Sequence, residues 1–358
     1  MKRRILILLL IAGIASTAEA QITVNATDPH LHYMGRTWTD NGAVALSWSG
    51  NSVDINFTGS SISTTLKDES GVNTYAVVLD GNVVQVLHPD QTKNDYKLAA
   101  GLSAGKHHLE LFKRTEWAMG KTWFYGFTLD NGAKVLAASP VHKRKIEFYG
   151  NSITCGYAVL DTEGKDRGTA QYEDGYNSYA AITSRHYNAE FSSISKSGIG
   201  ITVSWFPMIA PEMYDRLDAN DPNSKWDFSK YTPDVVVINL FQNDSWLVTM
   251  PNNEQFKARF GTTPPTPEFI INAYASYVKN IRAKYPKAHI ICILGSMDAT
   301  KAGSPWPGYI DKAVATLHDN NIYTHFIPYK NTNGHPSKKE QQDIADDLIG
   351  YMDKTVKW

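Results

Sequence analysis

The sequence of 358 residues predicts a two-domain protein in which an antiparallel β-sandwich precedes an α/β domain. The prediction rests on a change of pattern near residues 137–145. Before that point, short strands are separated by turn signals at intervals of about 8–12 residues, as in a sandwich. Beyond it, near-continuous apolar strands alternate with helical segments, as in a parallel sheet covered by helices on both faces.

Residues 1–20 have the pattern of a secretory signal peptide. A basic start precedes the apolar run at residues 5–12, and Ala18-Glu19-Ala20 forms a cleavage site. We expect cleavage after Ala20 and export to the periplasm or the medium. The run is shorter than the roughly 20 residues of a membrane span, and later apolar runs are strand-sized, so no membrane insertion is expected.

The sandwich is expected over residues 21–139. Its strand-like runs are Val44–Trp48, Val53–Phe57, Tyr75–Leu79, Val83–Leu87, His108–Phe112 and Trp123–Leu129. Turn clusters such as residues 49–51 and 80–82 separate them.

The α/β domain is expected over residues 140–358. Its strand-like runs are Ile146–Tyr149, Glu190–Ser195, Val235–Phe241 and His289–Leu294. The clearest helix covers residues 267–285, where apolar residues recur every three or four positions, and Thr266 is a suitable N-cap before Pro267. Ligands of such folds bind beyond the carboxyl ends of the strands.

Charge and cysteine content exclude several classes of protein. The chain has 35 basic and 36 acidic residues, and residues 1–20 contain three of the former and one of the latter. The remaining chain therefore has a small negative charge, which gives no basic surface for nucleic acid. The two cysteines, Cys155 and Cys292, are too few for a disulfide framework. Both lie in interior-type segments, so we expect buried free thiols, with pairing as the alternative.

Ser152 follows the apolar run at residues 146–149, where strand is expected to give way to helix. Its hydroxyl would then lie on the rim of the sheet, and its N–H would be free to face an anion. A serine nucleophile needs a neighbouring base, which a ring nitrogen of His335 can supply. The alternatives are an ordinary turn serine and a surface histidine that precedes the helix starting near Ser337.

Together with other short blocks, these residues resemble the SGNH (GDSL-type) hydrolase superfamily and, more narrowly, carbohydrate esterase family 2. The blocks occur in the same order over nearly all of the mature chain. They are Phe57-Thr58-Gly59, Leu79-Asp80-Gly81, residues 101–107, Lys113-Arg114-Thr115-Glu116, residues 150–156, residues 197–200, Asn243-Asp244 and residues 334–337. The resemblance implies an SGNH-type α/β domain after a small jelly-roll-like sandwich.

The resemblance also implies an oxyanion hole. Its donors would be the backbone N–H groups of Ser152 and Gly198 and the side-chain amide of Asn243. A glycine at 198 would let the backbone approach the substrate without a Cβ in the way, and such donors stabilise the tetrahedral intermediate of acyl transfer. Ordinary turns are the alternative interpretation of both segments.

This sequence departs from the superfamily pattern at three places. Asn151 replaces the usual aspartate before the serine, and Gln242 replaces the glycine before the asparagine, where it would crowd the pocket or add a donor. The acid expected two or three residues before the histidine is missing, because Thr332 and Asn333 occupy those positions. We therefore expect a Ser152–His335 dyad oriented by a backbone carbonyl, with Asp298 as the alternative acid.

Three tryptophans are candidates for stacking on sugar rings, namely Trp205, Trp246 and Trp306, each in a loop near the expected active edge. For any one of them, anchoring a loop to the core is the alternative. Gln242 joins them as a candidate substrate contact.

The N-terminal pattern predicts export, and the candidate residues predict a serine esterase. The resemblance implies that it removes acetyl groups from plant-type polysaccharides or oligosaccharides, such as acetylated xylan or mannan. The reaction would pass through an acyl-enzyme on Ser152. No residue spacing indicates a metal site or a phosphate-binding loop, so no cofactor is expected. The alternatives are a lipase or thioesterase of the same superfamily and an inactive carbohydrate-binding protein.

Overall fold

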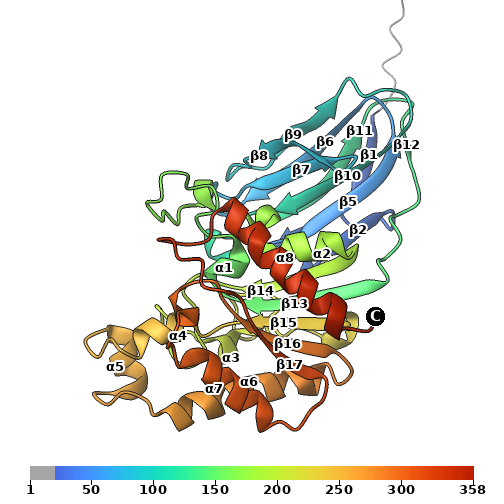
Figure 1. Cartoon of the computed structure of the whole chain (residues 1–358). Coiled ribbons are helices and arrows are strands. Elements are labelled where there is room, and N and C mark those ends of the chain that lie inside the picture. The colour runs from blue at the N-terminus through green and yellow to red at the C-terminus, as the bar shows by residue number, and fades with distance from the viewer. Residues whose placement is uncertain (1–20) are drawn as a thin grey trace, which may run out of the picture.

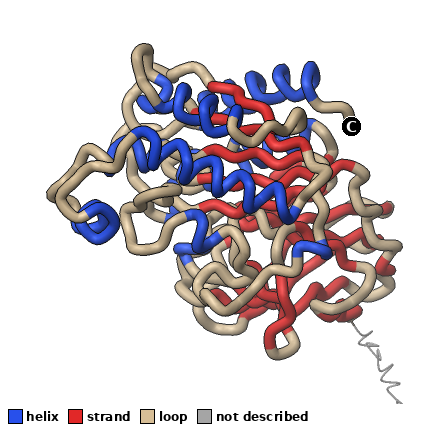
Figure 2. Tube along the Cα trace, turned by 90° about the horizontal axis from the view of Figure 1, so that it is seen from below, coloured by secondary structure: helices blue, strands red, loops and turns tan. Residues whose placement is uncertain are grey.

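The computed structural model describes residues 21–358, and the predicted signal peptide lies outside the described residues. An antiparallel β-sandwich is followed by a parallel five-stranded sheet with helices (Figure 1), which confirms the predicted fold class. Figure 2 shows that the helices gather around one group of strands, whereas the other strands form a body with few helices.

Two sheets pack face to face in the sandwich. The first has the order β3-β4-β11-β6-β9, with β1 on β11, and the second has the order β12-β5-β10-β7-β8, with β2 on β5. In chain order, the strands are β1 (Ile22–Asn25), β2 (Leu31–Met34), β3 (Thr37–Asp40), β4 (Ala43–Leu46), β5 (Ser52–Thr58), β6 (Ser61–Asp68), β7 (Tyr75–Leu79), β8 (Asn82–Leu87), β9 (Asn94–Ala100), β10 (Lys106–Lys113), β11 (Thr122–Leu129) and β12 (Lys134–Val135). Buried side chains of both sheets, among them Phe57 and Phe124, form the core between them.

The parallel sheet has the order β14-β13-β15-β16-β17. Its strands are β13 (Arg144–Gly150), β14 (Ala189–Ser195), β15 (Val235–Asn239), β16 (His289–Leu294) and β17 (Ile322–Phe326). The first strand, β13, lies between β14 and β15. The direction of winding therefore changes beside β13, and the carboxyl ends of β13 and β15 form the usual ligand-binding edge.

Helices cover both faces of this sheet. They are α1 (Ser152–Cys155), α2 (Tyr179–His186), α3 (Ala210–Met213), α4 (Gln242–Leu247), α5 (Glu254–Phe260), α6 (Pro267–Lys284), α7 (Trp306–Ala315) and α8 (Lys338–Thr355). Single turns of 3-10 helix are η1 (Trp117–Met119), η2 (Ala170–Tyr172), η3 (Gly175–Asn177), η4 (Phe228–Lys230) and η5 (Asp298–Thr300). Buried residues of α6 and α7 pack on one face, and those of α2 and α8 pack on the other.

Each expected strand is present within a few residues of its expected bounds, and the long helix α6 begins as expected. Thr266 Oγ1 accepts a hydrogen bond from the N–H of Phe269 at 3.2 Å, and Pro267 occupies the first turn. Strands β1, β3, β6, β9, β12 and β17 were not foreseen. Several of them are short or lie at sheet edges, where polar residues weaken the apolar pattern.

The sandwich packs directly on the α/β domain. Phe112 of β10 stacks on Phe191 of β14 with ring centroids 6.0 Å apart, and Trp48 and Trp117 are buried in the same core as the parallel sheet. The fully buried Arg36 donates to Glu147 of β13 at 3.1 Å. The two domains therefore share apolar and polar interior contacts.

Within residues 21–358, no helix is both long and apolar enough to cross a membrane. Cys155 and Cys292 are free and buried, which agrees with the expectation of two interior thiols.

Candidate active site

Ser152 is the first residue of α1, directly after β13. Asn151 caps this helix by accepting the N–H of Ile153 at 3.0 Å, so asparagine at this position orients the turn. A Cβ on Gly150 would lie only 2.0 Å from Thr154 Oγ1, which explains why the strand-to-helix turn requires glycine there. Among the described residues, none accepts a hydrogen bond from the N–H of Ser152, which is therefore available to a ligand.

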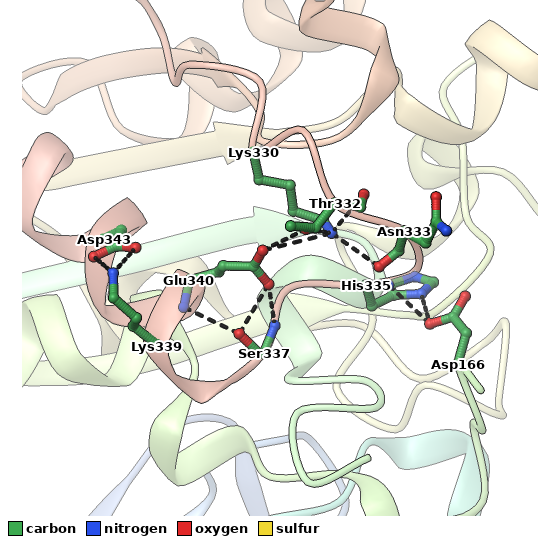
Figure 3. Close-up of polar contacts among 9 residues, drawn as sticks. All are labelled: Asp166, Lys330, Thr332, Asn333, His335, Ser337, Lys339, Glu340 and Asp343. Carbon is green, nitrogen blue, oxygen red and sulfur yellow. Dashed lines mark hydrogen bonds and ion pairs between the residues drawn. The ribbon is translucent and has the colours of Figure 1, made fainter. Parts of the chain in front are cut away.

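His335 lies between a serine and an aspartate. Its Nε2 is 2.7 Å from Ser152 Oγ, and its Nδ1 is 2.7 Å from Oδ1 of Asp166. The same Asp166 oxygen accepts the backbone N–H of His335 at 2.8 Å (Figure 3). This geometry is that of a Ser–His–Asp triad, in which the carboxylate orients the ring and leaves Nε2 for the serine.

The expectation of a dyad oriented by a backbone carbonyl is therefore wrong, because a carboxylate occupies the Nδ1 side of His335. Asp298 is not that carboxylate. Its oxygens instead accept hydrogen bonds from Trp246 Nε1 and Gln242 Nε2. Asp166 lies 169 residues before His335, so no local spacing in the sequence connects the two.

The loop that carries Asp166 is fixed by its own contacts. Asp161 accepts the N–H and Nη2 of Arg167 at 2.9 and 2.6 Å, and the Arg167 guanidinium lies 4.0 Å from the ring centre of Tyr172. Asp166 itself has a φ of 57°, a left-handed conformation that aspartate tolerates better than most residues. Partial burial acts to raise the pKa of Asp166, but hydrogen bonding and attraction to His335 lower it overall.

The His335 loop is braced from behind. Lys330 Nζ donates to the carbonyls of Thr332 and Asn333 at 3.0 and 3.2 Å (Figure 3). On the other side of His335, Glu340 accepts the N–H of Ser337 at 2.7 Å, which completes the N-terminal cap of α8. Thr332 and Asn333, which occupy the expected acid positions, thus hold the loop through their main-chain carbonyls, which accept hydrogen bonds from Lys330.

Tyr157 supports the imidazole directly, because its ring lies 4.3 Å from that of His335, centre to centre. Neither Tyr157 nor Asp166 was among the residues selected from the sequence. Each belongs to a loop without a recognisable pattern, so only the folded arrangement brings them to His335.

Gly198 lies in the loop after β14 with a φ of 82°. A Cβ there would lie 3.2 Å from the Phe206 ring and 3.3 Å from that of Trp205, so both conformation and space favour glycine. No residue in the described part of the chain accepts the N–H of Gly198. The buried carboxylate of Asp244 holds the next turn by accepting the N–H groups of Ile201 and Thr202 at 3.0 and 2.6 Å.

Asn243 lies at the start of α4, at the carboxyl end of β15. Its Nδ2 donates to the carbonyl of Ile199 at 2.8 Å, and its Oδ1 accepts Trp205 Nε1 at 3.0 Å. These contacts fix which side of the amide carries the donors and leave one N–H of Nδ2 for a ligand. Ser152, Gly198 and Asn243 therefore come from three adjacent strands at one edge of the sheet.

The candidate substrate contacts differ in exposure. Trp205 is 44% exposed beside Gly198, and Trp246 lines a cavity of about 230 Å³ next to the His335 loop. Trp306 is buried in the core of α6 and α7, so its proposed role as a substrate contact is wrong, and it packs the start of α7 against that core instead. Gln242 is also buried, where it holds Asp298 and accepts the N–H of Ala299 at 3.3 Å, so it is not a surface contact.

The described residues also contain one group of potential metal ligands, formed by Glu116, Cys155 and Glu173. All three are buried, Cys155 as the last residue of α1, and Glu116 accepts the N–H of Ser197 at 2.7 Å. The sequence spacing gave no indication of this group, because its members come from both domains.

The fold and site define a serine acylhydrolase on a parallel α/β sheet, and family comparisons agree. Residues 148–348 match the GDSL-like Lipase/Acylhydrolase family, and residues 33–140 match the N-terminal domain of carbohydrate esterase 2. A solved family two carbohydrate esterase from Clostridium thermocellum, in complex with cellohexaose, is 34% identical. The match covers 90% of this chain and 98% of that one with a TM-score of 0.80. This chain belongs to carbohydrate esterase family 2.

Two curated relatives extend the comparison. Cellulase/esterase CelE of Acetivibrio thermocellus is 34% identical over 95% of this chain, although this chain spans only 41% of that protein. An acetylxylan esterase / glucomannan deacetylase of Cellvibrio japonicus is 24% identical, with 94% of this chain and 92% of the relative covered.

Proposed function

We propose that this protein is a serine esterase that removes acetyl groups from plant-type polysaccharides or their oligosaccharides. Its family makes it a carboxylic ester hydrolase that acts on carbohydrate esters. The observation that carries the mechanism is the continuous chain of contacts from Ser152 Oγ through the His335 ring to Asp166, each 2.7 Å long.

In the first half of the reaction, Ser152 Oγ attacks the acetyl carbonyl while His335 Nε2 takes the hydroxyl proton. The oxyanion that forms accepts hydrogen bonds from the N–H groups of Ser152 and Gly198 and from Asn243 Nδ2. When the intermediate collapses, the C–O bond to the sugar breaks. His335 then gives its proton to the departing sugar oxygen, which leaves acetyl-Ser152.

In the second half, a water molecule attacks acetyl-Ser152 and gives a proton to His335 Nε2. Collapse of the second intermediate returns that proton to Ser152 Oγ and releases acetic acid, which ionises to acetate in solution. Asp166 stays ionised throughout, because attraction to the imidazolium lowers its pKa. Its function is to hold the ring and to stabilise the positive charge formed in each half.

The relatives support a carbohydrate substrate. Two are named for action on acetylated xylan and glucomannan, and a solved relative holds cellohexaose. In this chain, Trp205 is an exposed ring beside the proposed oxyanion hole, positioned to stack on a sugar. The cavity beside the His335 loop is polar, with Asp298, Lys301 and Thr332 in its lining, which suits hydroxyl groups better than an alkyl chain.

The proposal is tested by acetate release from acetylated xylan, mannan and pectin, compared with hydrolysis of a long-chain lipid ester. We expect kcat/KM to be highest for one of the acetylated glycans. Equal or greater rates on the lipid ester would favour the lipase alternative. Glycan binding without acetate release would favour an inactive binding protein.

Export is a separate part of the proposal. The signal-peptide pattern of residues 1–20 is its basis, and a polysaccharide substrate outside the cell agrees with it. The test is N-terminal sequencing of the protein secreted by an expressing bacterium, for which we expect a mature chain that begins at Gln21. Retention of the intact N-terminus inside the cell would contradict it.

A further inference from the structure

We infer that Glu116, a residue of the sandwich, is a positioning residue for the oxyanion hole of the other domain. The inference rests on the proposed function, because it assigns the N–H groups of Ser152 and Gly198 to the oxyanion. It implies that the sandwich is part of the catalytic apparatus, in addition to any contact that it makes with glycan.

The segment that carries Glu116 enters the α/β domain directly after β10. The carbonyl of Arg114 accepts the N–H of Gly175 at 2.7 Å, and its side chain pairs with Asp174 at 3.0 Å. Trp117, the next residue after Glu116, is buried in the core of the parallel sheet. Glu116 is therefore fixed in the interior between the two domains, where it is 2% exposed.

A single oxygen of Glu116 contacts two of the three segments that carry the proposed oxyanion donors, namely those of Ser152 and Gly198. Oε2 accepts the N–H of Ser197 at 2.7 Å, one residue before Gly198. It also accepts the thiol of Cys155 at 3.6 Å, on the short helix that starts at Ser152. The carboxylate therefore sets the separation between the helix that presents one N–H and the loop that presents the other.

The same loop has a second connection to the sandwich. Lys196 Nζ lies between two aromatic rings, 4.5 Å from the ring centre of Trp117 and 4.3 Å from that of Phe206. Phe206 is the residue whose ring lies nearest to the missing Cβ of Gly198. Trp117, the residue after Glu116, therefore contacts Lys196, the residue before Ser197.

Two further titratable side chains lie against Glu116. The backbone N–H of Glu116 donates to Glu173 Oε2 at 3.3 Å, and burial, followed by repulsion from Glu116, raises the pKa of Glu173 well above its ordinary value. The buried Lys113 donates to the carbonyl of Glu116 at 3.2 Å. Burial lowers the pKa of Lys113 to about 8, while attraction to acidic neighbours, Glu116 included, acts in the opposite direction.

Oxyanion donors act only when they lie about 2.7–3.1 Å from the developing charge, so small shifts of the Ser197 loop reduce the rate. An interaction realised only in the transition state changes kcat and leaves KM nearly constant. Loss of the Glu116 contact should therefore lower kcat, by less than the roughly 10²–10³-fold caused by deletion of a donor itself.

Three variants test this role through kcat and KM for a small acetyl ester. Glu116→Gln keeps the length of the side chain and an oxygen that accepts the Ser197 N–H, so kcat should stay within about threefold. Glu116→Asp keeps the charge but shortens the reach, and Glu116→Ala removes the acceptor. Both should lose about 10-fold or more in kcat with KM within about twofold.

Asp130→Ala is the matched control, because Asp130 also accepts main-chain N–H groups in the sandwich, from Ser60 and Ser61 at 2.9 and 3.3 Å. We expect unchanged kcat in this variant whatever its melting temperature. A drop equal to that of Glu116→Ala would mean that kcat merely follows the stability of the sandwich, and would overturn the inference.

If Glu116→Ala does not fold, the Gln and Asp variants decide. An active Asp variant with an impaired Gln variant would show that charge matters and acceptance does not, which contradicts the inference. Ser152→Ala separates this failure from that of the proposed function. Full activity of Ser152→Ala would refute the serine mechanism itself, whereas an inactive Ser152→Ala beside fully active Glu116 variants would refute the positioning role alone.

Discussion

Asp166 supplies the carboxylate for His335, since residues 332 and 333, where the superfamily pattern has an acid, are threonine and asparagine. It accepts both the ring and the backbone N–H of His335, so one carboxylate fixes the orientation of the side chain and of its loop. Its side chain is 37% exposed, so solvent weakens its attraction to the imidazolium. We therefore expect a smaller contribution than that of a fully buried triad acid.

Asp166→Asn tests that contribution. Asparagine can present an N–H to Nδ1 and so favour the wrong tautomer, and we expect kcat to fall by about 10²–10⁴-fold, the upper limit being that of a buried triad acid. The measurement is steady-state hydrolysis of an acetyl ester. Asp298→Asn is the control, because Asp298 contacts Trp246 and Gln242, and its kcat should change only modestly.

The pH dependence of this pair follows from the lowered pKa of Asp166. The ionised carboxylate is present above that pKa and is lost as the pH falls through it. The parent should therefore have a higher kcat than Asp166→Asn at every pH above the pKa of Asp166, neutral pH included. Equal kcat values of the two proteins at neutral pH would contradict the assignment.

The exposed fractions of Trp205 and Trp306 distinguish a candidate substrate contact from a residue of the core. Trp205→Ala should raise KM for a glycan and lower kcat, because the indole both lies exposed and donates to Asn243 Oδ1. Trp306→Ala should instead destabilise the fold by about 3–5 kcal/mol, since it leaves a cavity in a buried core. Kinetics and urea unfolding of both variants test this contrast, which a normal KM for Trp205→Ala would contradict.

At the scale of elements, the strands and helices that could be predicted from the sequence are those with regularly spaced, buried apolar residues. The strands at residues 235–239 and 289–294 and the helix after Thr266 are of this kind. Ser152 could be selected because it follows such a strand, and His335 because the block at residues 334–337 resembles the superfamily pattern. Asp166 lies in a loop whose geometry depends on the Asp161–Arg167 pair, a contact that no periodicity reveals.

The cluster of Glu116, Cys155 and Glu173 lies between elements of both domains. Among the described residues, it is the group whose side chains could bind a metal ion. Glu116 is already engaged by the Ser197 N–H, and the raised pKa of Glu173 favours its protonated form. We predict that EDTA leaves kcat and melting temperature unchanged. Loss of activity that a single divalent ion restores would contradict the metal-independent mechanism.

At the scale of the whole molecule, His32 joins the two domains. Its Nδ1 lies 2.7 Å from Asp54 of the sandwich, and its Nε2 lies 3.1 Å from Glu190 of the parallel sheet. Burial acts to lower the pKa of His32, but hydrogen bonds and attraction from the two carboxylates raise it to about 10. The protonated ring therefore pairs with Asp54 inside the sandwich and with Glu190 across the domain interface.

This pair predicts how stability depends on pH. A histidine whose pKa is higher in the folded state stabilises fully below its unfolded pKa of about 6.5. The contribution, on the order of a few kcal/mol, is lost as the pH rises towards about 10. Urea unfolding of His32→Gln should show less decline over this range than the parent, whereas the control His30→Gln, at an exposed pair, should behave as the parent does.

The most direct test of the central claim is the rate of acetate release by Ser152→Ala from an acetylated glycan, with the melting temperature as the control for folding. Ser152 Oγ is the one atom that every step of the proposed mechanism needs, and His335 Nε2 lies 2.7 Å from it. We predict a kcat lower by about 10⁴-fold or more in a normally folded protein. Acetate release at near-normal rates by the folded variant would contradict the account.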